Sequence, residues 1–277
     1  MSAGLGGYLD SLKIDVEAAV GRDPIRFPRR YSAIGDVEVA AAFSACLAFG
    51  RVTLFGPVLE AVFAEADRHG GPAAFADRLA DGMPDDLVLG LQYRWLRGPD
   101  LVGCLATLGR VRRAHGSLGA TFRPGPAATS LGGAIETLRA ALPSGASPAL
   151  RSLFAHPADG SACKRWCMLL RWLVRTGAPD LGVWTHLRPA DLVIPVDTHI
   201  FRVAGFLGLT TRRTADWRAA EQITAGLAAL DPHDPVRFDF ALAHLGISGL
   251  CRGFRDPDVC PSCALHPVCR ATPRPTS

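Results

Sequence analysis

Long hydrophobic runs are absent from this sequence. None of its 277 residues lies in a run of eighteen apolar, uncharged positions, which is about the length that a membrane-spanning helix needs. The first twenty residues carry four charged side chains where a secretion signal would need an unbroken apolar segment. We therefore expect neither a membrane span nor a secretion signal, and we expect the protein to be cytoplasmic.

Strand-like alternation of apolar and polar residues is also scarce, and no internal repeat is visible. Apolar residues instead recur at helical spacing, and glycine and proline divide the chain into segments of helix length. The sequence therefore predicts an all-α protein with a loop at 116–130. The predicted helices lie near 36–50, 52–69, 72–81, 84–97, 99–115, 131–141, 148–155, 162–176, 198–207, 214–230 and 235–247.

Lysine is scarce as well. Of the 30 basic residues, only Lys13 and Lys164 are lysine. An amine can lose its proton and attack carbon, whereas a guanidinium stays charged in proteins. Lys164 is therefore a candidate nucleophile, with an ordinary solvated surface residue as the alternative.

The segment around Lys164 has the pattern of a helix start. Ser161 is a good N-cap for a helix over 162–176, which places Lys164 at the third helical position. A cation there meets the positive end of the helix dipole, which favours the neutral amine. Helical steps put Arg171 and Arg175 on the same face, so we expect the amine to face a basic surface.

A second candidate lies in the segment that follows Pro195. Asp197 is placed to cap a helix that begins at Thr198, where the first amide groups stabilise a negative charge. An aspartate N-cap is usually structural. Together with Lys164, however, Asp197 is a candidate catalytic carboxylate.

Four cysteines lie within nineteen residues near the end of the sequence, at Cys251, Cys260, Cys263 and Cys269. Four thiolates can bind a zinc ion or a 4Fe–4S cluster. Zinc sites of this kind usually combine two C-x2-C elements, and here there is one, which favours the iron–sulfur cluster over zinc. The other cysteines lie in apolar helical segments and are predicted to be core residues: Cys46, Cys104, Cys163 and Cys167.

The net charge is only +4, but basic residues gather in two segments. Residues 101–135 hold four arginines and no acidic residue, and residues 151–178 hold five basic residues against Asp159 alone. These segments predict a phosphate-binding surface, with arginine scattered over an ordinary surface as the alternative.

Lysine, aspartate and four cysteines in this order resemble the helix-hairpin-helix base-excision DNA glycosylases, especially the endonuclease III and adenine glycosylase branch. VDTHIFRV at 196–203 is similar to the catalytic-aspartate motif of that family, and the cysteines resemble its cluster motif C-x6-C-x2-C-x5-C. GSACK at 160–164 is similar to the end of its hairpin, where the lysine is the nucleophile of bifunctional members. The resemblance covers roughly 156–270, and the first 150 residues resemble only a divergent bacterial branch.

The resemblance implies a two-domain helix-hairpin-helix fold. A six-helix barrel would span 36–190, and residues 1–35 together with 191–277 would form a domain that holds the cluster, with the active site in the cleft between the two.

It also implies an enzyme, a DNA N-glycosylase with abasic-site lyase activity, that acts as a monomer at the nucleoid on double-stranded DNA bearing a damaged base or an abasic site. Lys164 would attack C1′ of a flipped nucleotide, and Asp197 would stabilise the charge that develops on the sugar. The cluster would be structural. A non-catalytic iron–sulfur or zinc DNA-binding protein is the alternative. The candidate DNA contacts are Arg112, Arg113, Arg165, Arg171, His199, Arg252 and Arg255.

Three features depart from the family pattern. AHPADGSAC at 155–163 replaces the glycine hairpin L-P-G-V-G. Lys164 and Asp197 are 33 positions apart, an enlarged spacing similar to that of an archaeal 8-oxoguanine glycosylase branch, and the first cysteine loop is two residues longer than the family's. The damaged base is therefore not carried over. Tyr93, Trp95 and Trp184 are candidates for base stacking, with core packing as the alternative.

Overall fold

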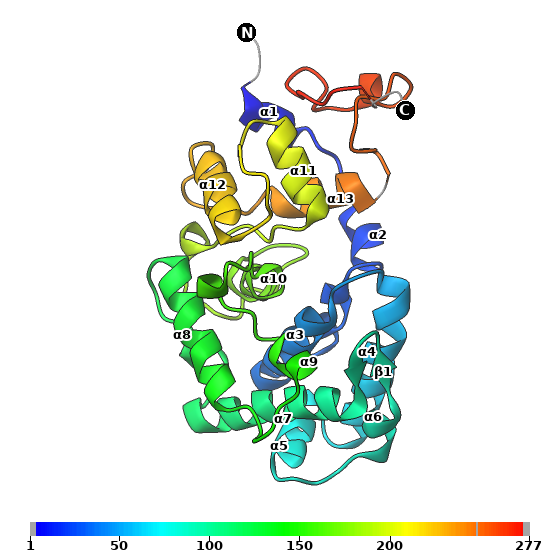
Figure 1. Ribbon diagram of the computed structural model, residues 1–277, viewed down its shortest axis with the longest axis vertical. Coiled ribbons are helices and arrows are strands. Elements are labelled where there is room, and N and C mark those ends of the chain that lie inside the picture. The colour runs from blue at the N-terminus through cyan, green and yellow to red at the C-terminus, as the bar shows by residue number, and fades with distance from the viewer. Residues whose placement is uncertain (1–3, 248, 274–277) are drawn as a thin grey trace.

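The computed structural model describes residues 4–247 and 249–273 and is predominantly helical (Figure 1), which confirms the all-α class. The α-helices in these residues are α1 (Leu5–Asp10), α2 (Val16–Val20), α3 (Ile34–Leu47), α4 (Val52–Arg68), α5 (Pro72–Ala80), α6 (Asp86–Gly90), α7 (Gly98–His115), α8 (Ala127–Ala140), α9 (Pro148–Arg151), α10 (Lys164–Val174), α11 (Thr198–Phe206), α12 (Trp217–Ala228) and α13 (Asp239–Ile247). The 3-10 helices are η1 (Pro24–Arg26), η2 (Pro28–Arg30), η3 (Gly119–Thr121), η4 (Pro157–Asp159), η5 (Pro189–Asp191) and η6 (Cys260–Ser262).

One predicted helix is wrong. The segment 84–97 contains the short α6 and then a hairpin of β1 (Gln92–Tyr93) and β2 (Leu96–Arg97). Tyr93 pairs with Leu96, and both side chains are buried, whereas Trp95 in the turn between them is exposed. Arg94 makes the turn with a left-handed φ of 53°.

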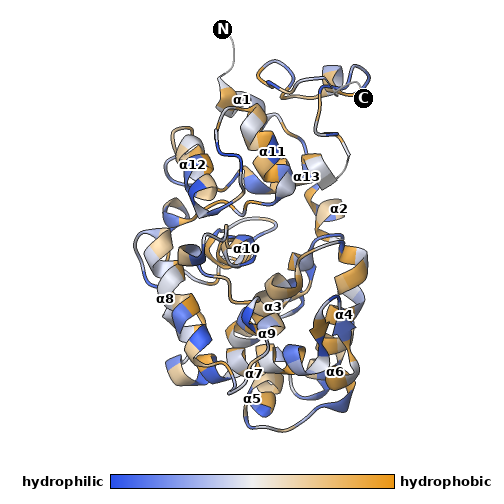
Figure 2. Ribbon diagram, viewed as in Figure 1, coloured by the Kyte–Doolittle hydropathy of each residue, from blue (hydrophilic) through white to orange (hydrophobic). Residues whose placement is uncertain are grey.

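Helix α3 lies at the centre of the larger part of the molecule (Figure 1), where it packs against α4, α5, α7 and α10. Its residues are buried from Val37 to Leu47, as expected for a helix that is apolar on all sides. Helices α5 and α7 pack closely, since a Cβ atom on Gly109 would lie 2.4 Å from the carbonyl oxygen of Ala76. The outer helices α8 and α12 instead carry both hydrophilic and hydrophobic residues (Figure 2), as amphipathic surface helices do.

The predicted loop at 116–130 is wrong at its end, since 127–130 belong to α8. The buried carboxylate of Glu38 holds the first part of this loop against α3. It accepts hydrogen bonds from the backbone amides of Leu118 (3.0 Å) and Gly119 (3.1 Å) and from the indole nitrogen of Trp184 (2.7 Å). Trp184 is therefore a core residue, and its role in base stacking is excluded by burial.

The two ends of the described chain lie together at one end of the molecule (Figure 1). Arg237 forms an ion pair with Asp10 of α1 at 2.7 Å. A cavity of about 210 Å³ is lined by Ser11–Ile14 on one side and by Cys263 on the other. The N-terminal segment is thus packed against the part of the chain that holds the four cysteines.

None of the helices in the described residues combines the length and apolar character required to cross a membrane.

Candidate active site

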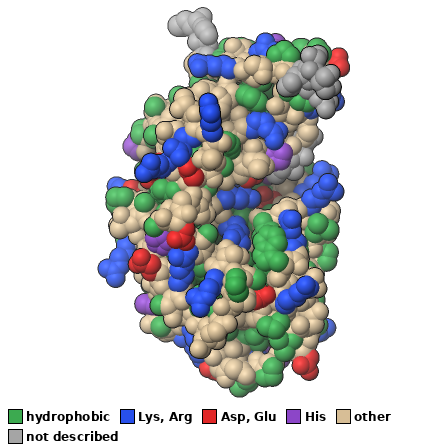
Figure 3. All heavy atoms as spheres, viewed as in Figure 1, with side chains coloured by type: hydrophobic (Ala, Val, Ile, Leu, Met, Phe, Trp, Pro, Cys, Tyr) green, Lys and Arg blue, Asp and Glu red, His purple; other side chains and the backbone are tan. Residues whose placement is uncertain are grey.

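Lys164 and Asp197 line the same two cavities. The first cavity, of about 490 Å³, is also lined by Met168, Arg171 and Asp239. The second, of about 520 Å³, is lined in addition by Phe49, Trp95, Arg165 and Trp166. The fold therefore brings together the two candidate catalytic residues, and lysine and arginine side chains gather around a hollow across the middle of the face in Figure 3.

Lys164 is the first residue of α10, not the third. Cys163 precedes it as the N-cap, in a left-handed conformation (φ 48°) and without a side-chain cap. The predicted cap, Ser161, does not reach the helix because its hydroxyl accepts the amide hydrogen of Cys163 at 3.1 Å and its backbone forms a bridge with Asp216. The side chain of Lys164 is half-buried, and its amine forms no hydrogen bond or ion pair with the described residues. Its amine is thus available to a ligand in either cavity.

Asp197 caps α11, as predicted. Its Oδ1 accepts the amide hydrogens of His199 (2.9 Å) and Ile200 (2.8 Å). Its Oδ2 accepts no hydrogen bond from the described residues. One oxygen therefore fixes the carboxylate, and the other remains for a group in the cavities.

Arg171 does not belong to an exposed basic surface, and that expectation is wrong. The residue is 3% exposed because two carboxylates from other segments neutralise it. Its Nε donates to Asp180 at 3.1 Å, and its Nη1 donates to Asp239. Its Nη2 is buried and has no partner, although Arg171 lines the first cavity. This nitrogen is therefore a buried donor without an acceptor among the described residues.

The charges of this buried group depend on one another. Burial opposes the charge of Arg171, but Asp180 and Asp239 outweigh it and raise the pKa of the guanidinium. Burial also raises the pKa of Asp239 to about 6, although Arg171 acts in the opposite direction. Asp197 is near enough for its negative charge to contribute to that rise. Sequence analysis missed Asp239, since nothing in the sequence distinguishes it from an ordinary residue at a helix start.

The β1–β2 hairpin presents an aromatic surface to the second cavity. Trp95 is 51% exposed and stacks on Phe49, with ring centroids 4.8 Å apart and an interplanar angle of 24°. The guanidinium of Arg94 lies 5.2 Å from the Trp95 ring, and that of Arg165 lies 5.5 Å from Phe49. Tyr93 is buried, and its hydroxyl donates a hydrogen bond to the carbonyl oxygen of Phe49, which helps to fix Phe49 in place. Of the three candidate aromatics, Trp95 is thus the one available for stacking.

The four cysteines near the C-terminus lie close to one another and are half-buried. Burial raises the pKa of Cys263, and the charges of Cys251, Cys269 and Cys260 raise it further. The Sγ of Cys260 also accepts the amide hydrogen of Asp256 at 3.2 Å. Among the described residues, no three of these sulfur atoms lie within 4.8 Å of one another. The four thiols are thus near enough to one another for their charges to interact.

The remaining four cysteines were predicted to be core residues, and all of them are buried: Cys46, Cys104, Cys163 and Cys167.

The candidate DNA contacts fall into two sets. Arg165, Arg171 and His199 line the cavities, and Arg165 is fixed by hydrogen bonds to the carbonyls of Cys46 (3.0 Å) and Ser152 (2.6 Å). The remaining residues have partners elsewhere. Arg112 pairs with Asp77, Arg113 with Asp81 (2.6 Å) and Arg252 with Asp256 (2.8 Å), and Arg255 donates to the carbonyl of Cys269 (2.9 Å).

Residues 23–248 match a protein family described as a protein of unknown function, DUF2400, and the chain belongs to this family. The matched part includes both cavities, Lys164 and Asp197, whereas the four cysteines follow it. No curated protein and no solved structure matches this chain.

Proposed function

We propose that this protein is a DNA glycosylase that excises a damaged base and cleaves the resulting abasic site through a Schiff base on Lys164. The observation that carries the proposal is the position of Lys164 and Asp197 on the walls of the same two cavities. A lysine without a partner beside a fixed carboxylate is the arrangement that nucleophilic attack on a sugar carbon needs.

The neutral amine of Lys164 would attack C1′ of the deoxyribose, and the bond from C1′ to the base nitrogen would break. The leaving base takes the bonding electrons and is protonated, while the amine nitrogen loses its protons as the sugar ring opens to a Schiff base. Loss of a proton from C2′ then expels the 3′ phosphate by β-elimination. The free Oδ2 of Asp197 would stabilise the positive charge on the sugar during attack and carry protons between these steps.

The two cavities suit two parts of a distorted DNA strand. The first has the volume of a small-ligand pocket, and a flipped base in it would lie near the guanidinium of Arg171. The second holds the stacked Phe49 and Trp95, on which an unpaired base would stack. Double-stranded DNA with a damaged base or an abasic site is therefore the proposed partner, bound between the barrel part of the chain and the part that holds both ends.

The four thiols of Cys251, Cys260, Cys263 and Cys269 would hold a 4Fe–4S cluster. They are near enough to one another for their charges to interact, and their spacing along the sequence favours the cluster over zinc. Such a cluster would cross-link the segment 249–273 and would take no part in redox chemistry on the base. Arg252 and Arg255 would then be fixed beside it, near the DNA backbone.

Borohydride trapping on DNA that contains an abasic site tests the proposal. Wild-type protein should give a covalent adduct, because reduction fixes the Schiff base to the strand. Lys164→Ala should give none, whereas Lys13→Ala, which changes the other lysine of the chain, should trap as wild type does. Adduct formation by Lys164→Ala would place the nucleophile elsewhere, and DNA binding without any trapping would favour the non-catalytic alternative.

Asp197→Asn separates the cap from the chemistry. Asparagine retains a capping oxygen for α11, so the free energy of unfolding should fall by less than about 1 kcal/mol. Base excision should slow by orders of magnitude because the negative charge is lost. Asp15→Asn, the same change at the N-cap of α2, is the matched control and should leave excision unchanged. If Asp197→Asn unfolds the protein, or excises as wild type does, the role of Asp197 is structural.

A further inference from the structure

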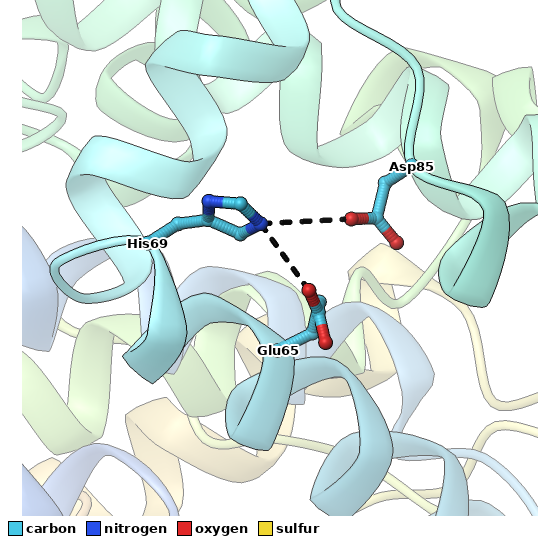
Figure 4. Close-up of side chains that lie close together, drawn as sticks. All are labelled: Glu65, His69 and Asp85. Atoms are coloured by element: carbon cyan, nitrogen blue, oxygen red, sulfur yellow. Dashed lines mark ion pairs between the residues drawn. The ribbon is translucent and has the colours of Figure 1, made fainter.

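Glu65, His69 and Asp85 form a cluster of possible metal ligands outside both cavities. Figure 4 shows the three side chains pointing toward one another, from the end of α4 and the residue before α6. The Nε2 of His69 lies 3.2 Å from Oε1 of Glu65 and 3.9 Å from Oδ2 of Asp85. One atom from each side chain lies within 4.8 Å of the other two. It is the only such group of three or more histidine, cysteine or carboxylate ligands among the described residues.

Each of the three possible ligands is held in place by its own surroundings. The Oδ1 of Asp85 accepts the amide hydrogen of Val88 at 2.9 Å, which turns Oδ2 toward His69. The imidazole of His69 stacks on Phe75, with centroids 5.4 Å apart and an interplanar angle of 8°. Contacts of this kind orient the ligands of protein metal sites.

The third ligand, Glu65, is fixed in the same manner. Its Oε2 accepts a hydrogen bond of 2.5 Å from Arg68, which leaves Oε1 for the cluster. Glu65 and His69 are four residues apart, so they lie on one face of α4 and its C-terminal cap. Asp85 and Glu65 have side chains only 8% and 13% exposed, whereas His69 is 29% exposed. One side of the cluster is therefore open to solvent.

The spacing is close to what a zinc ion requires. Nitrogen and oxygen ligands at about 2.0–2.1 Å from a tetrahedral zinc ion lie about 3.3 Å apart. The distance of 3.2 Å between His69 and Glu65 meets this value, and the distance of 3.9 Å to Asp85 requires a shift of about half an ångström. Two carboxylates and a neutral imidazole would also supply the charge that balances a divalent cation.

We propose that Glu65, His69 and Asp85 bind a zinc ion, with solvent at the remaining position. The ion connects the end of α4 to the start of α6. It thereby stabilises the segment that precedes the β1–β2 hairpin, which carries Trp95. This site is independent of Lys164 and Asp197.

Zinc titration of the purified full-length protein by calorimetry tests the site. Asp85→Asn keeps an oxygen for the Val88 amide but removes the ligand charge, and His69→Gln removes the imidazole. Asp86→Asn makes the same change at the next, exposed position and is the matched control. Thiolates also bind zinc, so parallel spectra with Co²⁺ identify the ligands. Cobalt on sulfur absorbs intensely in the near ultraviolet, whereas cobalt on nitrogen and oxygen gives only weak visible bands.

Wild type and Asp86→Asn should bind one ion with the weak visible bands alone. Asp85→Asn and His69→Gln should each weaken this binding by at least about 10–100-fold. If one variant fails to fold, the other decides. Equal binding by all four proteins, cobalt spectra with sulfur bands only, or no binding to wild type would overturn the proposal. Borohydride trapping should be unchanged in both variants, so this result is separate from the glycosylase test.

Discussion

Asp197 and Asp239 are two carboxylates that face the first cavity with different partners. Two amide hydrogens at the start of α11 hold Asp197, whereas the buried guanidinium of Arg171 holds Asp239. Burial raises the pKa of Asp239 to about 6. The first cavity is thus lined by a carboxyl group that changes its charge near pH 6.

This difference predicts a pH dependence of stability for Asp239. A raised pKa means that the folded state holds the proton more tightly than the unfolded chain does. The contribution to stability is complete below the ordinary pKa of 3.8 and is lost as the pH rises through about 6. Asp239→Asn has no such titration, so the difference in free energy of unfolding should shift by roughly 3 kcal/mol in favour of the variant between about pH 4 and pH 7.

Urea unfolding of wild type, Asp239→Asn and Asp86→Asn at several pH values measures this shift. Asp86 is exposed, so the difference between its variant and wild type should change little. A constant difference between Asp239→Asn and wild type would mean that Asp239 stays ionised throughout the range.

At the scale of single elements, the β1–β2 hairpin carries the exposed aromatic ring nearest to the candidate site. Its ring is supported by Phe49 on one face and by the Arg94 guanidinium, so little side-chain entropy remains to be lost when a base stacks on it. The hairpin is therefore suited to bind an unpaired base with two cations beside it, Arg94 and Arg165.

Trp95→Ala should weaken binding to duplex DNA that contains an abasic site. Loss of one base-stacking contact costs about 1–3 kcal/mol, which is roughly 5- to 150-fold in Kd. Fluorescence anisotropy with labelled DNA measures the change. Leu54→Ala is the matched control, since Leu54 is 57% exposed on α4 and lines neither cavity. Equal Kd values for the two variants would exclude the stacking role.

At the scale of the whole molecule, the segment 249–273 holds the four cysteines and has little regular structure. Its regular structure is confined to η6 and an isolated bridge between Arg255 and Pro273. Backbone hydrogen bonds such as that from the Arg270 amide to the Phe206 carbonyl (2.9 Å) join it to the rest of the chain, and Leu265 is buried in the core. A bound group that links four thiols would supply the order that backbone hydrogen bonds do not.

The purified protein should therefore be brown and contain about four iron atoms per chain. Cys263→Ser should lose iron and become sensitive to protease within 249–273, while Cys104→Ala, which changes a buried core cysteine, should keep its iron. Iron analysis and limited proteolysis measure both effects. Colourless wild-type protein with one zinc ion per chain would replace the cluster with the zinc alternative.

The sequence by itself determined the helical class, the Asp197 cap and the burial of four cysteines. Each of these depends on local spacing: apolar residues at helical intervals, an aspartate directly before a helix, and thiols within apolar segments. Local spacing also singled out Lys164 and Asp197, which the fold then placed on common cavities. Local signals failed where two patterns competed, as at 84–97, where a short alternating segment was predicted as helix.

Only the tertiary structure decided which charged and aromatic side chains face the cavities. Arg171 is on the predicted face of α10, but Asp180 and Asp239, which are 9 and 68 positions away, turn that face into a buried ion-pair network. Trp95 and Trp184 were both candidates for stacking, yet Glu38 binds the indole of Trp184 in the core while Trp95 stacks on Phe49 at the surface. The partners that determine burial and charge pairing at these positions are distant along the chain. The local sequence around each residue therefore cannot predict them.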